Sequence, residues 1–349
     1  MSSQLGLSQN TNQTQPFSRQ DYLILWGGIL FSLIFTTVIY LSGRRLESVP
    51  LLPDQGAAWY YWKLPNPTFL THATAWGLYL AHQITIWVLL WRAKKAKLKY
   101  SDRMHWFNWA ILGANAAFIV LHLIQTQIWY DGLAQDVSVF SSQGSVIVML
   151  VWILLMENSR RGLFFGKKAP ISKEIMRWAR EYHGYFFAWA TIYTFWFHPM
   201  VNPTGHLIGF FYMFLLLLQG SLIYTRVHIN KWWTVSLEVI VAVNGTLVAL
   251  VNANSLWQMF AFGFAAIFVV TQMWGLGLKT WSKIAILAGY GAAIILVFSQ
   301  VGFSKIYQIT WIPIIEYGAV FLLAGIIGLG LLVARQIRGR NLSTLSSPG

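Results

Sequence analysis

Apolar residues in this chain gather in long runs separated by short polar segments. Ten of these runs are about twenty residues long and nearly free of charge. A chain that crosses hydrocarbon must satisfy its own backbone amides, and a helix of roughly 20 apolar residues does so across a bilayer. The pattern therefore predicts ten transmembrane helices, at 22–43, 69–91, 106–130, 137–156, 181–199, 206–225, 234–251, 256–278, 281–301 and 310–333.

The expected fold class is an all-α, polytopic integral membrane helix bundle. Hydrophobic residues make up 56% of the chain and charged residues only 10%, against roughly 25% charged in soluble domains. We expect a single transmembrane domain over 21–335, flanked by disordered cytoplasmic tails at 1–20 and 336–349. The first tail has no basic region and no small-residue cleavage site, so no cleaved signal peptide is expected.

The distribution of lysine and arginine predicts the orientation of the bundle. All but four of the 25 cations lie in loops on one side of the predicted membrane; the exceptions are Arg44, Arg45, Lys63 and Lys305. Cations near span ends are retained in the cytoplasm, so both termini are predicted to be cytoplasmic. We expect the chain in the cytoplasmic (inner) membrane or a related energy-transducing membrane.

This topology also explains the net charge of +14. In a soluble protein that charge would suggest nucleic acid, which is not expected as a partner here. Beyond the lipid bilayer itself, the expected partners are anionic lipids at the basic cytoplasmic loops. Spaced small residues let helices approach closely, and they occur at Ala285, Gly289 and Ala293 and again at Ala324 and Gly328. They indicate packing within the bundle or a homo-oligomer.

Cysteine is absent, which excludes disulfides, thiolate metal sites and thioether-attached haem. Histidines are therefore the remaining ligands for an electron-carrying cofactor. His82 lies about 20 Å from the outer end of its span and His122 about 24 Å from the inner end of its own. Both are deep in the membrane, where ionisable groups are expensive and usually functional.

The layered histidines suggest an outer pair, His122 with His198, and an inner pair, His82 with His183. This plan is similar to that of membrane b-type cytochromes, in which paired histidines on neighbouring helices bind haem. The resemblance implies a transmembrane electron carrier or reductase with b-type haem. Separations of 14 or 18 residues would place two histidines on one helix face, whereas His183 and His198 are 15 apart.

A second site is predicted where two histidines share one outer loop. His198 and His206 fall within the segment HPMVNPTGH, close enough to bind one metal ion, although only two ligands are visible.

Other functions remain open from the sequence. A small-solute or ion transporter would use Glu238 and Glu316, the two carboxylates within spans, for ion coupling. Prolines at span ends, such as Pro313, do not predict broken helices. An enzyme acting on lipid or quinone would use His183, Glu181 and nearby cations, and a noncatalytic membrane assembly or scaffold protein would use none of these groups.

Overall fold

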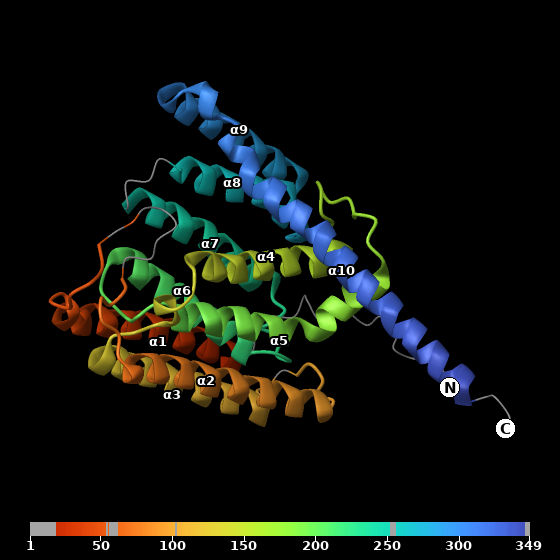
Figure 1. Cartoon of the computed structure of the whole chain (residues 1–349). Helices are drawn as coiled ribbons and strands as arrows, with labels where there is room; N and C mark the ends of the chain where they lie inside the picture. The colour runs from red at the N-terminus through yellow and green to blue at the C-terminus, as the bar shows by residue number, and fades with distance from the viewer. Residues whose placement is uncertain (1–18, 54, 56–61, 102, 252–255, 346–349) are drawn as a thin grey trace. The chain divides into compact units, whose positions relative to one another are not determined.

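The computed structural model describes residues 19–345, apart from 54, 56–61, 102 and 252–255. Within these residues all regular secondary structure is helical, and β pairing is limited to isolated bridges. The α-helices are α1 (Arg19–Gly43), α2 (Phe69–Lys95), α3 (Trp106–Trp129), α4 (Val139–Arg161), α5 (Lys173–Phe197), α6 (Thr204–Ser221), α7 (Lys231–Val251), α8 (Trp257–Val270), α9 (Thr280–Val301) and α10 (Gln308–Leu345) (Figure 1). Short 3-10 turns are η1 (Arg44–Leu46), η2 (Leu133–Gln135), η3 (Gln272–Gly275) and η4 (Phe303–Lys305).

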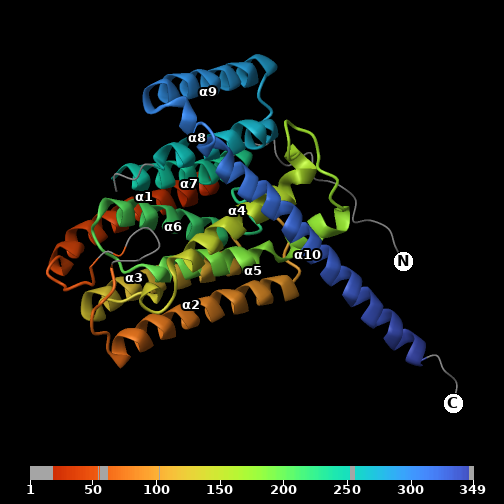
Figure 2. The same cartoon turned by 45° about the horizontal axis from the view of Figure 1, so that its top comes forward.

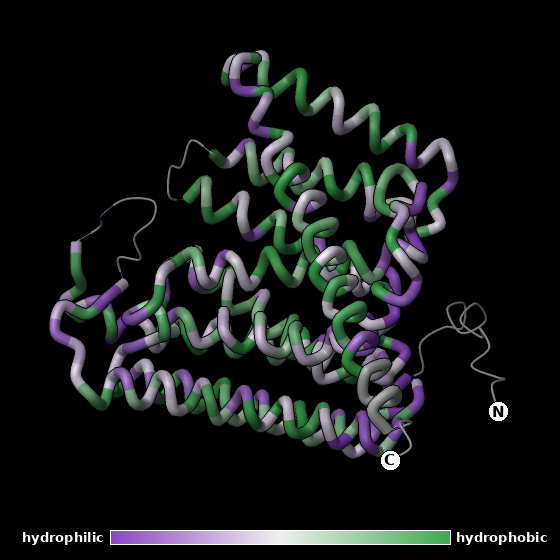
Figure 3. The backbone as a smooth tube through the Cα atoms, turned by 45° about the vertical axis from the view of Figure 1, so that its right-hand side comes forward, coloured by the Kyte–Doolittle hydropathy of each residue, from purple (hydrophilic) through white to green (hydrophobic). Residues whose placement is uncertain are grey.

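The predicted all-α, polytopic membrane fold is confirmed. In the described part of the chain, nine helical segments are long and apolar enough to cross a membrane. Apolar residues run along the helices and polar residues gather near their ends (Figure 3). Many large apolar side chains face outward, as expected where lipid replaces water as the surrounding solvent.

The helix α5 does not reach the apolar length of the other nine. The sequence predicts a span at 181–199, whereas the structure places this segment in a longer, uninterrupted helix that begins earlier, Lys173–Phe197. Its first half contains Lys173, Glu174, Arg177, Arg180 and Glu181. Because of these charges, α5 is not apolar enough over its whole length to count as a membrane span, although it is long enough.

The last helix differs from its predicted bounds at both ends. Pro313, placed by the sequence pattern near a span end, lies inside α10, six residues into the helix. Proline has no amide proton, so the carbonyl of residue 309 has no helical partner. At the other end, α10 continues past the predicted limit of 333 to Leu345, into the segment predicted as a tail. Residues 346–349 lie outside the described residues.

Local sequence signals fix several helix ends. Thr68 caps α2, because its hydroxyl oxygen accepts a hydrogen bond from the Thr71 backbone amide at 3.3 Å. At the start of α3, the Asn108 side chain accepts from the His105 backbone amide at 2.8 Å. Tyr130 ends α3 in the left-handed conformation, with φ of 43°.

The chain folds as two compact units. Unit 1 comprises 1–146 and 184–244, and unit 2 comprises 147–183 and 245–349. The boundary passes through α4, α5 and α7. The prediction of one domain over 21–335 stays a prediction.

The core of unit 1 includes an apolar cluster between α1, α6 and the start of α7. Its buried members are Leu25, Leu215, Leu218, Leu222, Val227, Trp233 and Leu237. Gly28 on α1 permits this contact, since a Cβ there would lie 2.5 Å from a methyl carbon of Leu218. Helices α2 and α3 lie side by side in the same unit (Figures 1 and 2).

Unit 2 is built around the packing of α10 on α8. Gly263 on α8 is in close contact with Ile312, since a Cβ at Gly263 would lie 3.0 Å from the Ile312 Cβ. Further along α10, Gly328 packs against Ile175 of α5. Gly289 on α9 has no such neighbour among the described residues. The spaced small residues on α10 thus form a packing face, whereas those on α9 are left uncovered in their unit.

Candidate functional sites: a buried histidine core and a buried glutamate

The two deepest predicted histidines are both completely buried in unit 1. His82 on α2 and His122 on α3 are each 0% exposed. His82 Nδ1 lies 3.2 Å from the indole Nε1 of Trp196 on α5. Because an indole nitrogen only donates, Nδ1 must accept and the proton of neutral His82 must be on Nε2. That nitrogen lies 2.8 Å from Asn115 Oδ1 and donates to it.

The hydrogen bonds of His82 continue through Asn115 to α6. The Asn115 amide donates to Ser221 Oγ at 3.0 Å and to the Leu217 carbonyl at 3.3 Å. The Ser221 hydroxyl in turn donates to the same Leu217 carbonyl at 2.7 Å. Every donor in this series of hydrogen bonds has an acceptor, and the network joins α2, α3, α5 and α6.

His122 is bonded at both ring nitrogens as well. Its Nε2 donates to the His198 backbone carbonyl at 2.9 Å, and its Nδ1 lies 3.2 Å from Gln125 Oε1. With Nε2 protonated, the Nδ1 of neutral His122 is an acceptor. The Gln125 side chain can donate to it if its amide group is rotated by half a turn, so that the amide nitrogen takes the place of Oε1. The Gln125 Nε2 has no other partner among the described residues. The His122 ring also packs on Trp196, with ring centroids 4.2 Å apart.

These contacts bear on the predicted haem ligands. The structure brings His122 and His198 together, with His122 Nε2 bonded to the His198 backbone carbonyl. His82 and His122 each use both ring nitrogens for hydrogen bonds, so this donor set does not fit haem iron without exchange of those bonds. His183 belongs to unit 2, where its Nδ1 donates to the Arg180 carbonyl, so its pairing with His82 stays a prediction.

The two histidines of the predicted metal site do approach one another. The rings of His198 and His206 are 5.2 Å apart and nearly perpendicular, and Trp62 packs on His206 at 4.2 Å. Within the residues that the structure covers, no group of three or more His, Asp or Glu side chains is placed to hold a metal ion. The two-histidine site stays a prediction.

The loop after α3 contains a third buried polar group. Asp131 Oδ1 accepts from the Gly132 amide at 2.8 Å, and burial raises the pKa of this carboxyl to about 6. Nearby, His72 Nδ1 and Trp76 Nε1 both contact Asp136 Oδ2, at 2.9 and 2.8 Å. The Asp136 contacts tie this loop to α2.

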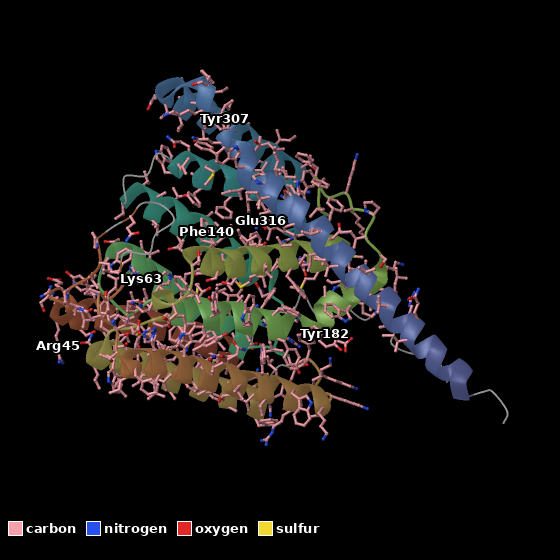
Figure 4. All side chains as sticks on the ribbon, in the orientation of Figure 1. Arg45, Lys63, Phe140, Tyr182, Tyr307 and Glu316 are labelled. Carbon is pink, nitrogen blue, oxygen red and sulfur yellow. The ribbon has the colours of Figure 1, made fainter. Side chains whose placement is uncertain are left out.

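Of the two span carboxylates, Glu316 has the more unusual surroundings. It lies on α10 in unit 2 (Figure 4), is 2% exposed, and its Oε2 has no hydrogen-bond partner among the described residues. Lys305, in η4 just before α10, is exposed and forms no ion pair with Glu316 in the described structure. Glu238 on α7 is also buried, within electrostatic range of the Tyr212 hydroxyl on α6.

Sequence reasoning missed the partners of the histidines, although one signal was present. Asn108, Asn115 and His122 are spaced by seven residues, which places all three on nearly one face of α3. Polar residues repeated on one face of an apolar helix indicate an interhelical hydrogen-bonding face. Trp196 gave no such signal.

Comparison with known proteins gives no further guide to function. No family model, curated protein or solved structure matches this chain. The established description is therefore that of a multi-pass, all-α membrane protein.

Proposed function

We propose that this protein is a transporter that moves protons across the membrane, and that Glu316 binds the transported proton. The observation that supports the proposal is the burial of the Glu316 carboxyl within α10, with Oε2 unbonded among the described residues. Ionisable residues are expensive at such positions and usually mark an ion pathway or a proton relay.

A proton fits this carboxyl better than a metal cation. A bare buried carboxylate is costly unless a charge or hydrogen bonds compensate it. Sodium-sized and divalent cations take several oxygen ligands, and within the described residues no group of three or more His, Asp or Glu side chains is placed to hold a metal ion. Protonation removes the charge and needs no further ligand.

The buried face of α10 offers a route to Glu316. Gln308, Ile312 and Glu316 follow one another at intervals of four residues and are all buried, so they lie on one side of the helix. Gln308 Oε1 is also without a partner in the described structure. It lies two turns before Glu316, about 12 Å along the axis. Pro313 interrupts the backbone hydrogen bonding between these two polar groups.

Proton uptake into proteoliposomes tests the proposal. Vesicles loaded with potassium and pyranine receive valinomycin, which sets an inside-negative potential, and pyranine reports internal acidification. We expect wild-type vesicles to acidify well above empty liposomes. The acidification rate of Glu316→Gln should be at least about tenfold lower, since an amide, unlike a carboxyl, does not take up and release a proton near neutral pH.

Glu174→Gln is the matched control. This carboxylate lies in unit 2 as well but is more exposed and pairs with Arg335 on α10, so its loss should leave the flux unchanged. Equal flux in wild type and Glu316→Gln, or no flux above empty liposomes, would disprove the proposal. Carbodiimide labelling, which requires a protonated carboxyl, should modify the Glu316 peptide and not the Glu174 peptide.

A further inference from the structure

Gln83 on α2 is a buried polar residue that takes no part in the hydrogen bonds of His82 and His122 or in the proton transport proposed for Glu316. Its side chain is 4% exposed, yet neither Oε1 nor Nε2 has a hydrogen-bond partner among the described residues. Buried polar groups are nearly always bonded, so an amide with both ends open needs an explanation. Gln83 belongs to unit 1 and Glu316 to unit 2, and a role for Gln83 does not require proton transport by Glu316.

The contacts of α2 with α5 place Gln83 opposite Trp189. The Tyr79 ring packs on Tyr193 at 5.9 Å, and the Trp87 indole donates to the Tyr185 carbonyl at 3.0 Å. These pairs show that α2 and α5 run antiparallel, because residue numbers rise on one helix as they fall on the other. Gln83 lies midway between Tyr79 and Trp87, and Trp189 lies midway between Tyr185 and Tyr193.

Aromatic rings line this part of the interface. Trp76 packs on Tyr79 at 5.9 Å, and Trp189 stacks on Tyr193 at 5.9 Å with an interplanar angle of 25°. The polar ends of these rings are already occupied. The Tyr193 hydroxyl contacts Ser141 Oγ at 2.7 Å, and the side chains of Tyr79 and Trp189 hydrogen-bond each other. The Gln83 amide, one helical turn after Tyr79 on the same face of α2, keeps both polar atoms without a partner among the described residues.

We propose that Gln83 and the aromatic rings around Trp189 bind the head group of a membrane-soluble quinone. A quinone carbonyl accepts from Gln83 Nε2, and a quinol hydroxyl donates to Oε1, so one amide serves both forms. The flat ring stacks on indole or phenol faces. The ligand is neutral, since α2 has no Lys, Arg, Asp or Glu between Phe69 and Trp91 and an isolated charge would be costly there.

Saturation binding in phosphatidylcholine nanodiscs tests this site. Tritiated decylubiquinone is titrated onto the full-length protein, with uptake by empty nanodiscs subtracted, and decylubiquinol is added as a competitor. We expect saturable binding by the wild type that decylubiquinol displaces. Gln83→Leu should bind about tenfold more weakly, because it keeps the apolar volume and removes both hydrogen-bonding atoms.

Two controls separate ligand binding from folding. Gln127→Leu removes an amide on α3 that donates to the Ser42 carbonyl, and it should bind decylubiquinone as the wild type does. Gln83→Leu should melt at or above the wild-type temperature, because it removes an unbonded buried amide. Unsaturable binding by the wild type would overturn the site. So would wild-type affinity in Gln83→Leu, which would assign the amide to bound water alone.

Discussion

Replacing His82 by leucine tests whether the histidine core is a structural network that holds four helices together. The substitution removes the ring and leaves two buried groups without a partner, the Asn115 Oδ1 and the Trp196 Nε1. Each orphaned group costs about 1–3 kcal/mol where the alternative is water. In a bilayer the unfolded state also finds partners, and interhelical hydrogen bonds average about 0.6 kcal/mol.

For two lost bonds these figures bracket the loss between about 1 and about 6 kcal/mol. We expect about 3 kcal/mol, nearer the middle, because both orphaned groups belong to buried side chains, with Asn115 6% and Trp196 0% exposed. The free energy of unfolding is measured by titration with dodecyl sulfate in mixed micelles, followed by far-ultraviolet circular dichroism.

Two further variants make the measurement specific. Thr85→Val on α2 removes a hydroxyl that bonds only within its own helix, to the Ala81 carbonyl, and should change stability by less than about 0.5 kcal/mol. The double variant His82→Leu with Asn115→Leu should cost less than the sum of the two single changes, since the partners are removed together. A His82→Leu protein as stable as the wild type, or strict additivity in this cycle, would refute the network.

Two further predictions concern the loop after α3. Gly132→Ala should destabilise the protein by about 1–3 kcal/mol, since its Cβ would lie 2.5 Å from the Phe197 carbonyl oxygen. Gly77→Ala, whose Cβ would have no atom within 4 Å, should instead stabilise the protein by about 0.5–1 kcal/mol. The melting temperatures of the two variants, each compared with the wild type, test both expectations. Burial raises the pKa of Asp131 from 3.8 to about 6, so ionised Asp131 opposes folding; stability should therefore be fullest below the unfolded pKa and decline as pH rises from about 4 to about 6. Asp131→Asn should remove that pH dependence, and an unchanged pH profile in this variant would contradict the assignment.

Much of the fold follows from the sequence because a membrane span is a local property. The length of an apolar run and the absence of charge within it are decided residue by residue, so the pattern predicts the spans around α1, α2 and α3 within a few positions. The same local features place His82, His122 and Glu316 within predicted spans. They mislead where charge and apolar length coexist in one helix, as in α5.

What only the tertiary structure decided is which polar groups meet. Lipid tails provide no hydrophobic drive between helices, so helix rotation and register depend on close packing and hydrogen bonds between distant segments. No local pattern announces that Trp196 donates to His82, or that Asn115 bridges to Ser221. For the same reason, only the assembled helices show that Glu316 and Gln83 keep buried polar atoms without a partner in the described chain. Local sequence determines how deep in the membrane a side chain lies, whereas its hydrogen-bond partners depend on how both helices are rotated about their axes.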